Sequence, residues 1–409
     1  MRNRLDTTAI VHCALMRDNW INAYRIVVTM DDEVDPDILQ QALDSMTERY
    51  PTICSRIVKG KFWYYTEKLD KITVREDNGV LLGTVNNKSV FEQATYILYS
   101  GNKIILEEFH SITDGHGAFT FLNGLTGAYC AIRNGSLRIN AYKGEFVKEE
   151  LEDGFLRHGG KVETIEEPYK ITKPFFFEND AHKKYMDATV FRMKTARVRA
   201  LAKENHCSMN ELLAAVLFRS IFDMKESEGK DVVLTVPINL RRLFETPTLL
   251  NFSQLTQAVL KNDGRLKELS EMTAEIRRQI KYQNNEKYLR NGISKIAALR
   301  KTPLMRFAPF FLKSFAIRLA TKLGAEKSCM TITNLGNIAA MMPAGEKNIR
   351  NIDVILAPRR NAPYNCGIIS LNEDLNITIT HSKEHIRLVE KISEQLNAVG
   401  IEFCKEKFI

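Results

Sequence analysis

Apolar and polar residues follow two different periods along the chain, so strands and helices are expected to be interleaved over its whole length. In the first half, β-branched and aliphatic runs predict strands at 23–30, 61–66, 95–100 and 102–109. A helix is expected to open at Asp35-Pro36, with aspartate at the N-cap and proline at the first helical position. A second helix is expected from 115 to 133.

The second half repeats this mixture of elements. Ser208-Met209-Asn210-Glu211 has the Ser-x-x-Glu form of a capping box and precedes an apolar run, which predicts the start of a helix. Other helices are expected at 195–205, 212–222, 266–288, 304–323 and 383–399. Strands are expected at 231–237, 252–261, 329–333, 352–356, 366–371 and 375–380.

The stretch 142–173 is polar, rich in Lys and Glu, and has little periodicity. It is the best candidate for a crossover between two α/β parts of similar size. A chain of 409 residues exceeds one ordinary core, so two domains are expected, at 1–165 and 166–409.

Composition favours a soluble intracellular protein. Apolar residues make up 44% and charged residues 26%, which are globular values. No run approaches the roughly 18–20 apolar residues of a membrane helix, and no long apolar stretch follows the basic N-terminus as in a secretory signal. The seven cysteines are scattered without a Cys-x-x-Cys pair, which favours reduced thiols in the cytoplasm over a zinc or disulfide framework.

The formal charge of +8 admits two interpretations. Lys and Arg are spread along the chain without a basic and aromatic run, so nucleic acid is not an expected partner. A solvated basic surface is favoured. The alternative is a positive groove for an anionic cofactor such as coenzyme A, whose phosphates need cations.

The segment His110-Ser111-Ile112-Thr113-Asp114-Gly115 carries the candidate chemistry. An apolar strand runs into it, and Gly115 and Gly117 are expected to let the backbone turn sharply into a helix. A histidine placed there suits a general base that takes the proton of an alcohol as it attacks a thioester. Asp114 either orients the imidazole directly or turns away and locks the loop by pairing with an arginine. A core histidine with an aspartate cap is the structural alternative.

This segment resembles the His-x-x-x-Asp-Gly signature shared by chloramphenicol acetyltransferase, nonribosomal-peptide condensation domains, plant acyl-CoA alcohol acyltransferases and microbial alcohol acetyltransferases. Pro237-Ile238-Asn239-Leu240-Arg241 resembles the strand-end motif of the second half, and Thr333-Asn334-Leu335-Gly336 a stretch of the alcohol acetyltransferase branch. Condensation domains usually carry a second histidine where this chain has Phe109, and the Asp-Phe-Gly-Trp-Gly stretch of the plant enzymes is missing. The chain is therefore most similar to the alcohol acetyltransferase-like branch.

The resemblance implies a mixed α/β fold in which two chloramphenicol-acetyltransferase-like domains form a V around a solvent tunnel. His110 and Asp114 are the candidate catalytic residues: His110 is the implied base, and Asp114 is implied to be structural, held by Arg241. Gly115 is implied to let the loop turn, and Asn334 to shape the tunnel or steady the oxyanion. No residue is assigned to cofactor binding.

The resulting hypothesis is acyl transfer, often of acetyl, from acyl-CoA to a hydroxyl or amine, with no permanently bound cofactor or metal. An alternative donor is an acyl chain on a carrier protein, used for ester or amide formation in polyketide, lipid or peptide assembly; a basic tunnel mouth suits both donors. A non-catalytic binding module of the same fold is disfavoured by the presence of His110, Asp114 and Arg241 together.

The other polar features are better explained by structural or solvent-facing roles than by metal binding. His116 has no matching ligand cluster, and His381 and His385 are not expected on one helix face, because 378–380 has a strand pattern. The remaining histidines, His12 among them, give no signal. Residues 300–327 combine seven basic residues with several phenylalanines; a core or cofactor-facing helix is favoured there over membrane contact.

Overall fold

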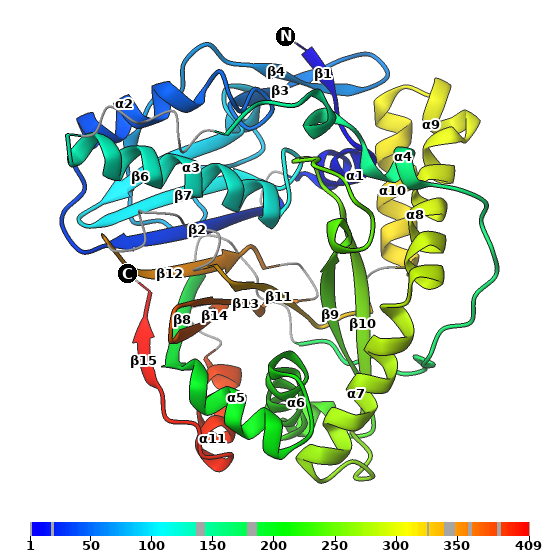
Figure 1. Cartoon of the computed structure of the whole chain (residues 1–409). Helices are drawn as coiled ribbons and strands as arrows, with labels where there is room; N and C mark the ends of the chain where they lie inside the picture. The colour runs from blue at the N-terminus through cyan, green and yellow to red at the C-terminus, as the bar shows by residue number, and fades with distance from the viewer. Residues whose placement is uncertain are drawn as a thin grey trace.

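Two large sheets, one above the other in Figure 1, form the frame of the molecule. The computed structural model describes residues 2–17, 20–135, 144–177, 186–324, 327–338, 348–358, 362–382 and 386–408. The mixed α/β class expected from the sequence is confirmed. Within the described ranges, no helix has both the length and the apolar character that crossing a membrane requires.

The upper sheet has five strands in the order β12-β2-β7-β6-β5. Helices α2 and α3 cover its upper face (Figure 1), and a three-stranded sheet, β1-β4-β3, lies beyond them. The bounds are β1 Arg2–Arg4, β2 Ala23–Met30, α2 Pro36–Met46, β3 Ser55–Lys59, β4 Tyr64–Lys68, β5 Arg75–Glu76, β6 Thr95–Ser100, β7 Lys103–Phe109, α3 Gly115–Arg133 and β12 Ile349–Leu356.

The lower sheet has seven strands in the order β10-β9-β11-β13-β14-β8-β15, and α5, α6 and α11 cover its lower face (Figure 1). Strands β9 and β10 form a long antiparallel pair at its edge. The bounds are β8 Met186–Lys194, α5 Thr195–Glu204, α6 Met209–Phe222, β9 Asp231–Asn239, β10 Ser253–Lys261, β11 Met330–Asn337, β13 Asn365–Leu371, β14 Asp374–Ser382, α11 Arg387–Ala398 and β15 Cys404–Lys407.

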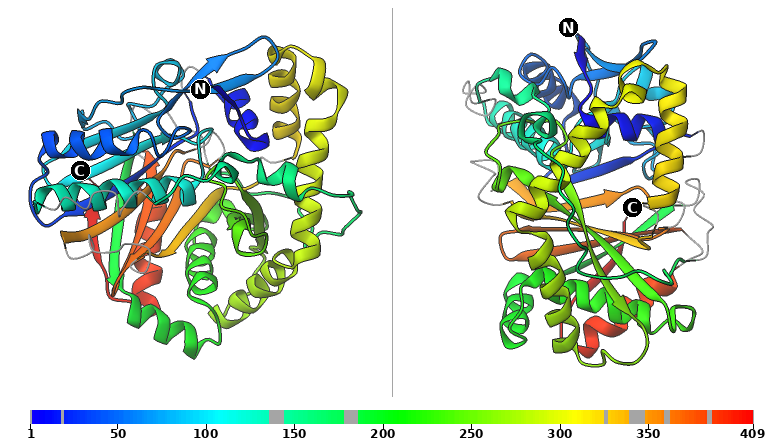
Figure 2. Two further views of the ribbon diagram at one scale, coloured as in Figure 1. Left: turned by 45° about the horizontal axis from the view of Figure 1, so that its top comes forward. Right: turned by 90° about the vertical axis from the view of Figure 1, so that its right-hand side faces the viewer.

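The remaining helices stand along one side of both sheets, as the two views of Figure 2 agree. Their bounds are α1 Thr7–Leu15, α4 Gly154–His158, α7 Leu269–Gln283, α8 Glu286–Lys301, α9 Pro303–Phe307 and α10 Phe310–Gly324.

Most predicted elements are confirmed, and two predicted helices are wrong in extent. The helix expected at 266–288 is too long, since α7 ends at its C-cap, Asn284. Most of α8 lies beyond the expected range and was missed; the Asn285 side chain caps it by accepting from the Tyr288 N–H at 2.9 Å. The helix expected at 304–323 breaks at Pro309, between α9 and α10. The sequence reasoning missed α1, α4, β1, β3, β5, β8 and β15.

One strand, β12, joins the upper and lower parts of the molecule. β12 comes from the second half of the sequence, yet it pairs antiparallel with β2 of the upper sheet and packs against β13 and β14 of the lower one. Residues 144–173 carry the chain from the upper to the lower part, as expected of a crossover (Figure 1). The domain boundary near residue 165 stays a prediction.

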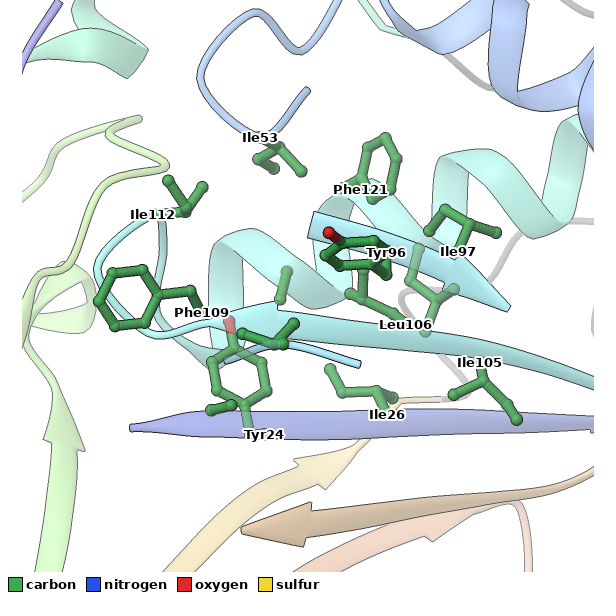
Figure 3. Packing of buried hydrophobic residues seen from close by; sticks show 14 of the residues in the cluster. Tyr24, Ile26, Ile53, Tyr96, Ile97, Ile105, Leu106, Phe109, Ile112 and Phe121 are labelled. Carbon is green, nitrogen blue, oxygen red and sulfur yellow. The ribbon is translucent and has the colours of Figure 1, made fainter. Parts of the chain in front are cut away.

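The upper core fixes the end of β7, where His110 follows. Ile26, Leu106 and Phe121 pack between the sheet and the helices above it, and Phe109 and Ile112 close the end of this core (Figure 3). Each of these side chains is at most 1% exposed. Close packing of this kind leaves the strand end little freedom to shift.

A buried ion pair sets the register of β2 against β7. Arg25 and Glu107 are directly opposed across the two strands, and Arg25 Nε donates to Glu107 Oε2 at 2.6 Å. Asp77 accepts two further bonds from the guanidinium, and the Val85 N–H donates to the other oxygen of Glu107 at 2.6 Å. A slip by one residue would place Arg25 and Glu107 on opposite faces of the strand pair and break their bond, so the pair helps to specify the register of β2 on β7.

Replacing one partner of this pair is expected to be costly. Arg25→Met leaves the Glu107 carboxylate buried without its cation, and we expect a loss of about 3–5 kcal/mol in the free energy of unfolding. The measurement is urea denaturation. The double variant Arg25→Met/Glu107→Leu should recover most of the loss, and a double variant as unstable as the single one would contradict the explanation.

Candidate active site

His110 lies on the tight loop between β7 and α3. Its backbone N–H donates to the Asn22 carbonyl at 2.9 Å, and its ring Nδ1 is 3.1 Å from Asn251 Oδ1. An amide oxygen only accepts, so this contact assigns the ring proton to Nδ1. The basic lone pair of the neutral imidazole is therefore on Nε2.

Asn251 is itself held by a carboxylate from the start of the chain. Its backbone N–H and its Nδ2 donate to Asp6 Oδ2 at 3.2 and 3.1 Å. The other oxygen, Oδ1, caps α1 by accepting from the Ala9 N–H at 2.7 Å. Burial, and then the negative charge of Asp153, raise the pKa of Asp6 to about 6. A hydrogen-bonded chain thus runs from α1 through Asp6 and Asn251 to His110.

A second histidine lies against the first. The ring of His12 stacks on that of His110 with centroids 4.6 Å apart, and the edge of Tyr24 closes another side at 5.0 Å. Asn22 Nδ2 donates to His12 Nδ1 at 2.9 Å, which assigns the proton of the neutral His12 ring to Nε2.

Both histidines are neutral at neutral pH. Burial lowers the pKa of His110 below 6.5, although its own backbone carbonyl, Asp114 and Asn251 act in the opposite direction. Burial, and then the charge of His110, hold the pKa of His12 well below 6.5. A neutral His110 at physiological pH is ready to accept a proton.

Asp114 turns away from His110 and toward the lower part of the molecule. Its Oδ2 accepts from Arg241 Nη1 at 2.8 Å and from the Phe252 N–H at 2.9 Å, and its Oδ1 caps α3 at the Gly117 N–H. Both side chains of the ion pair are buried. Of the two arrangements that the sequence left open, the pairing with an arginine is the one present.

The other contacts of Arg241 bear directly on the candidate base. Its Nε and Nη2 donate to the Thr248 and Leu250 carbonyls at 2.8 and 2.5 Å. Asn251 follows immediately in this segment, so the cation that pairs with Asp114 also holds the backbone that presents the Asn251 amide to His110. Arg241 lies in the 3-10 turn Leu240–Arg242 at the end of β9.

A role of Gly115 and Gly117 in a sharp turn stays a prediction. Neither residue has a positive φ. A Cβ on Gly115 would lie 2.8 Å from Leu335 Cδ2, and one on Gly117 would lie 2.4 Å from the Leu249 carbonyl oxygen. At Gly117 the obstacle is backbone of the second half, so glycine is required there, whereas the Leu335 methyl group near Gly115 is the end of a side chain that can move.

Asn334 lies on β11 with its amide already engaged. Its Oδ1 accepts from the Gly336 N–H at 2.7 Å, and its Nδ2 donates to Asn210 Oδ1 at 2.5 Å. Gly336 has φ +79°, which permits the irregular end of this strand. The residue of this motif that touches the His110 loop is Leu335, and an oxyanion or tunnel role for Asn334 stays a prediction.

Structural comparison places these contacts in a known fold. No family model and no curated protein matches the sequence. Polyketide synthase associated protein 5 from Mycobacterium tuberculosis aligns over 97% of this chain and 98% of its own, with 14% identity and a TM-score of 0.60. The chain has the chloramphenicol acetyltransferase-like fold.

Two further solved structures share this fold. TRI101 from Fusarium sporotrichioides, complexed with coenzyme A and T-2, aligns over 100% of this chain and 99% of its own, with 10% identity and a TM-score of 0.63. The epimerization domain from the third module of tyrocidine synthetase B aligns over 98% and 97%, with 13% identity and a TM-score of 0.61. The expected two-part arrangement agrees with these structures, and the tunnel past His110 stays a prediction.

The other candidate features are not among the groups that hold the His110 ring, although His116 is close enough to Asp114 for its charge to lower the pKa of that carboxyl. His381 is in β14, where its ring bonds Thr189 Oγ1 at 2.9 Å; His385 lies outside the described residues. His116 is in the first turn of α3. Across the described ranges, His, Cys, Asp and Glu side chains form no group of three or more suited to a metal ion. Of the two roles expected for the helix at 300–327, a core position is wrong for Phe307, Phe311 and Phe315, which are each 69% exposed, and a cofactor-facing side stays a prediction.

Sequence reasoning missed the residues that hold the His110 ring. His12 precedes His110 by 98 residues, and Asn251 follows it by 141. The Asp6-Thr7-Thr8 start before an apolar run is an N-cap signal that would have predicted α1. No local pattern marks Asn251, whose role comes from its position after the segment that Arg241 binds.

Asp114→Asn is expected to lose about 3–5 kcal/mol of unfolding free energy at neutral pH, because the guanidinium of Arg241 stays buried without its counter-charge. Arg241 lowers the pKa of Asp114 below 3.8, so the stabilisation is complete above that pH and is lost as pH falls through the lower folded-state pKa. The difference between the two proteins should therefore shrink below pH 3.8. Urea denaturation at several pH values measures it.

Asp374→Asn is the control for removing a charge. Asp374 pairs with Lys194 at 2.6 Å on the surface, so its loss should change stability little. An Asp114→Asn protein with native stability but no activity would contradict the anchoring role and favour direct participation of Asp114 in catalysis.

Proposed function

We propose that the protein is an acyltransferase that moves an acyl group, acetyl in the first instance, from a coenzyme A thioester to a hydroxyl. The observation that carries the proposal is the His110 ring, neutral and held at Nδ1 by Asn251, at the end of a rigid strand. This is the arrangement that a general base needs.

In this reaction the acceptor oxygen attacks the thioester carbonyl carbon while its proton moves to His110 Nε2. A C–O bond forms, and the carbonyl electrons move to oxygen. The tetrahedral adduct then collapses, the C–S bond breaks, and the proton passes from Nε2 to the departing sulfur. The products are an ester and free coenzyme A. Proton transfer of this kind contributes about 10²–10⁴ in rate.

The surroundings of His110 suit this cycle. When Nε2 takes the proton, the imidazolium keeps its Nδ1–H bond to the Asn251 oxygen. His12 stays neutral beside it, so the new charge meets no second cation in the stacked ring. Asp114, bound to Arg241, does not compete for the proton.

The choice of donor and acceptor is supported by proteins of the same fold. TRI101 structures are described as complexed with coenzyme A and with T-2 or deoxynivalenol, and TRI3 as a trichothecene 15-O-acetyltransferase. Acyl-CoA and an alcohol are the corresponding pair proposed for this chain, with an amine as the alternative acceptor.

A carrier-protein donor is the second candidate. A polyketide synthase associated protein and the condensation domain from the Monacolin K polyketide synthase share the fold. Against condensation, the position before His110 is Phe109, which is fully buried in the upper core and offers no second base. Matched acetyl-CoA and acetyl-carrier-protein donors, compared at equal concentration, separate the two.

His110→Ala should abolish the release of free thiol when the protein is mixed with acetyl-CoA and a panel of alcohols. The expected loss is about 10²–10⁴-fold, since only the base is removed. His116→Ala, which removes a histidine six residues away in α3, should keep most of the activity. Thiol release that survives His110→Ala, or is lost equally in His116→Ala, would rule out this mechanism.

Asn251→Ala should lower kcat about 100-fold, because the ring loses the bond that orients it. The acid limb of the pH–rate profile should lie below pH 6.5 in the native protein. It should move to still lower pH in the variant, since the Asn251 bond raises the pKa of His110. Measuring kcat as a function of pH for the native protein and the variant gives both the loss in rate and the position of the acid limb.

Asn262→Ala is the control for losing an amide. Asn262 Nδ2 bonds the Phe222 carbonyl and Ser227 Oγ, so its loss should lower stability but leave the profile unchanged. An acid limb of Asn251→Ala that stays in place would contradict the contact with His110.

A further inference from the structure

An apolar face with basic neighbours lies on the outside of α9 and α10. Phe307, Phe311 and Phe315 are each 69% exposed, and Leu312 and Leu319 are 44% and 47% exposed. Phe311, Phe315 and Leu319 are spaced four residues apart on α10, so they share one side of the helix. Large apolar side chains gathered in this way mark a contact surface. Figure 2 (right) shows both helices at the surface of the molecule.

The inner side of α10 is fixed, so this face cannot turn inward. Phe310 stacks on Tyr64 with centroids 4.0 Å apart. Lys313 is buried, donates from Nζ to the Phe62 carbonyl at 2.7 Å, and lies 3.5 Å from the centre of the Trp63 ring. Arg318 Nε donates to the Ala14 carbonyl of α1 at 2.7 Å. Phe310 and Lys313 point inward, whereas Phe311 and Phe315 point outward.

The charges around this face have one sign. From Leu299 to Gly324 the sequence contains six Lys or Arg residues and no Asp or Glu. Lys301 and Arg306 are exposed, and the Arg306 guanidinium lies 5.6 Å over the Phe307 ring. Arg300 is paired with Asp153, whereas the exposed Lys301 and Arg306 supply a positive border to the apolar face.

We propose that this face of α9 and α10 docks the protein on an anionic lipid surface. Exposed phenylalanines enter the boundary between headgroups and acyl chains, while Lys and Arg beside them meet the negative headgroups. The helix lies on the surface and does not cross it. This inference stands apart from the proposed acyl transfer, because it needs neither substrate nor His110.

Charge argues against a second copy of this chain as the occupant. In a symmetric dimer the same patch meets itself, so Lys301 and Arg306 would face their own copies. The net charge of +8 adds to this repulsion. An anionic bilayer supplies both the apolar medium and the opposite charge.

The test is flotation of the full-length protein with vesicles, in low and high salt. We expect binding to vesicles of phosphatidylcholine and phosphatidylglycerol in equal parts, and binding at least about tenfold weaker to phosphatidylcholine alone or in high salt. Phe311→Ser/Phe315→Ser should weaken binding to the anionic vesicles at least about tenfold. Lys301→Gln/Arg306→Gln, which leaves the apolar side chains in place, should also weaken it.

Phe146→Ser/Leu255→Ser is the matched control, since these residues lie outside α9 and α10 and are 44% and 59% exposed. It should bind as the native protein does. Circular dichroism checks that each variant folds. Three outcomes would overturn the proposal: no binding by the native protein, equal loss in the control, or a dimer in sedimentation equilibrium that depends on Phe311. Thiol release measured without vesicles reports on acyl transfer separately.

Discussion

The buried ion pair between Asp114 and Arg241 is the constraint on which the candidate site depends. It joins the loop after β7 to the end of β9, and the Phe252 N–H adds a second bond to the same carboxylate oxygen. Burying two charges is unfavourable unless each is well paired. Here Arg241 also bonds two carbonyls and Asp114 also caps α3, so the cost is offset by several hydrogen bonds.

The orientation of His110 follows from this pair. Arg241 holds residues 248–250, and the next residue, Asn251, presents its amide oxygen to the ring. Asp6 holds the nitrogen of the same amide, which ties the site to the start of α1. The upper sheet supplies the base and the lower part supplies the group that orients it. A base built from both parts is consistent with acyl transfer at their junction.

Elements with strong local signals were predictable from the sequence: the strand 23–30 and the helix 115–133 match β2 and α3 residue for residue. The pairing of Asp114 with Arg241 was implied by the resemblance and is present. The contacts of His12 and Asn251 were not predictable, because they arise where distant segments meet and leave no periodic pattern. The helix boundary at Asn284-Asn285 was not recognised, because it lies within a continuous charged stretch. The pairing of β12 with β2 was not predictable either, because it depends on the topology of the sheet.

The proposed acyl transfer requires that His110 Nε2 takes the proton of the acceptor. An experimental structure with a non-reactive acyl-CoA analogue and an alcohol bound together tests it most directly. The alcohol oxygen is expected within hydrogen-bond distance of Nε2, about 2.6–3.2 Å, with Nδ1 still on the Asn251 oxygen. An alcohol bound away from Nε2, with the thioester carbonyl beside another side chain, would contradict it.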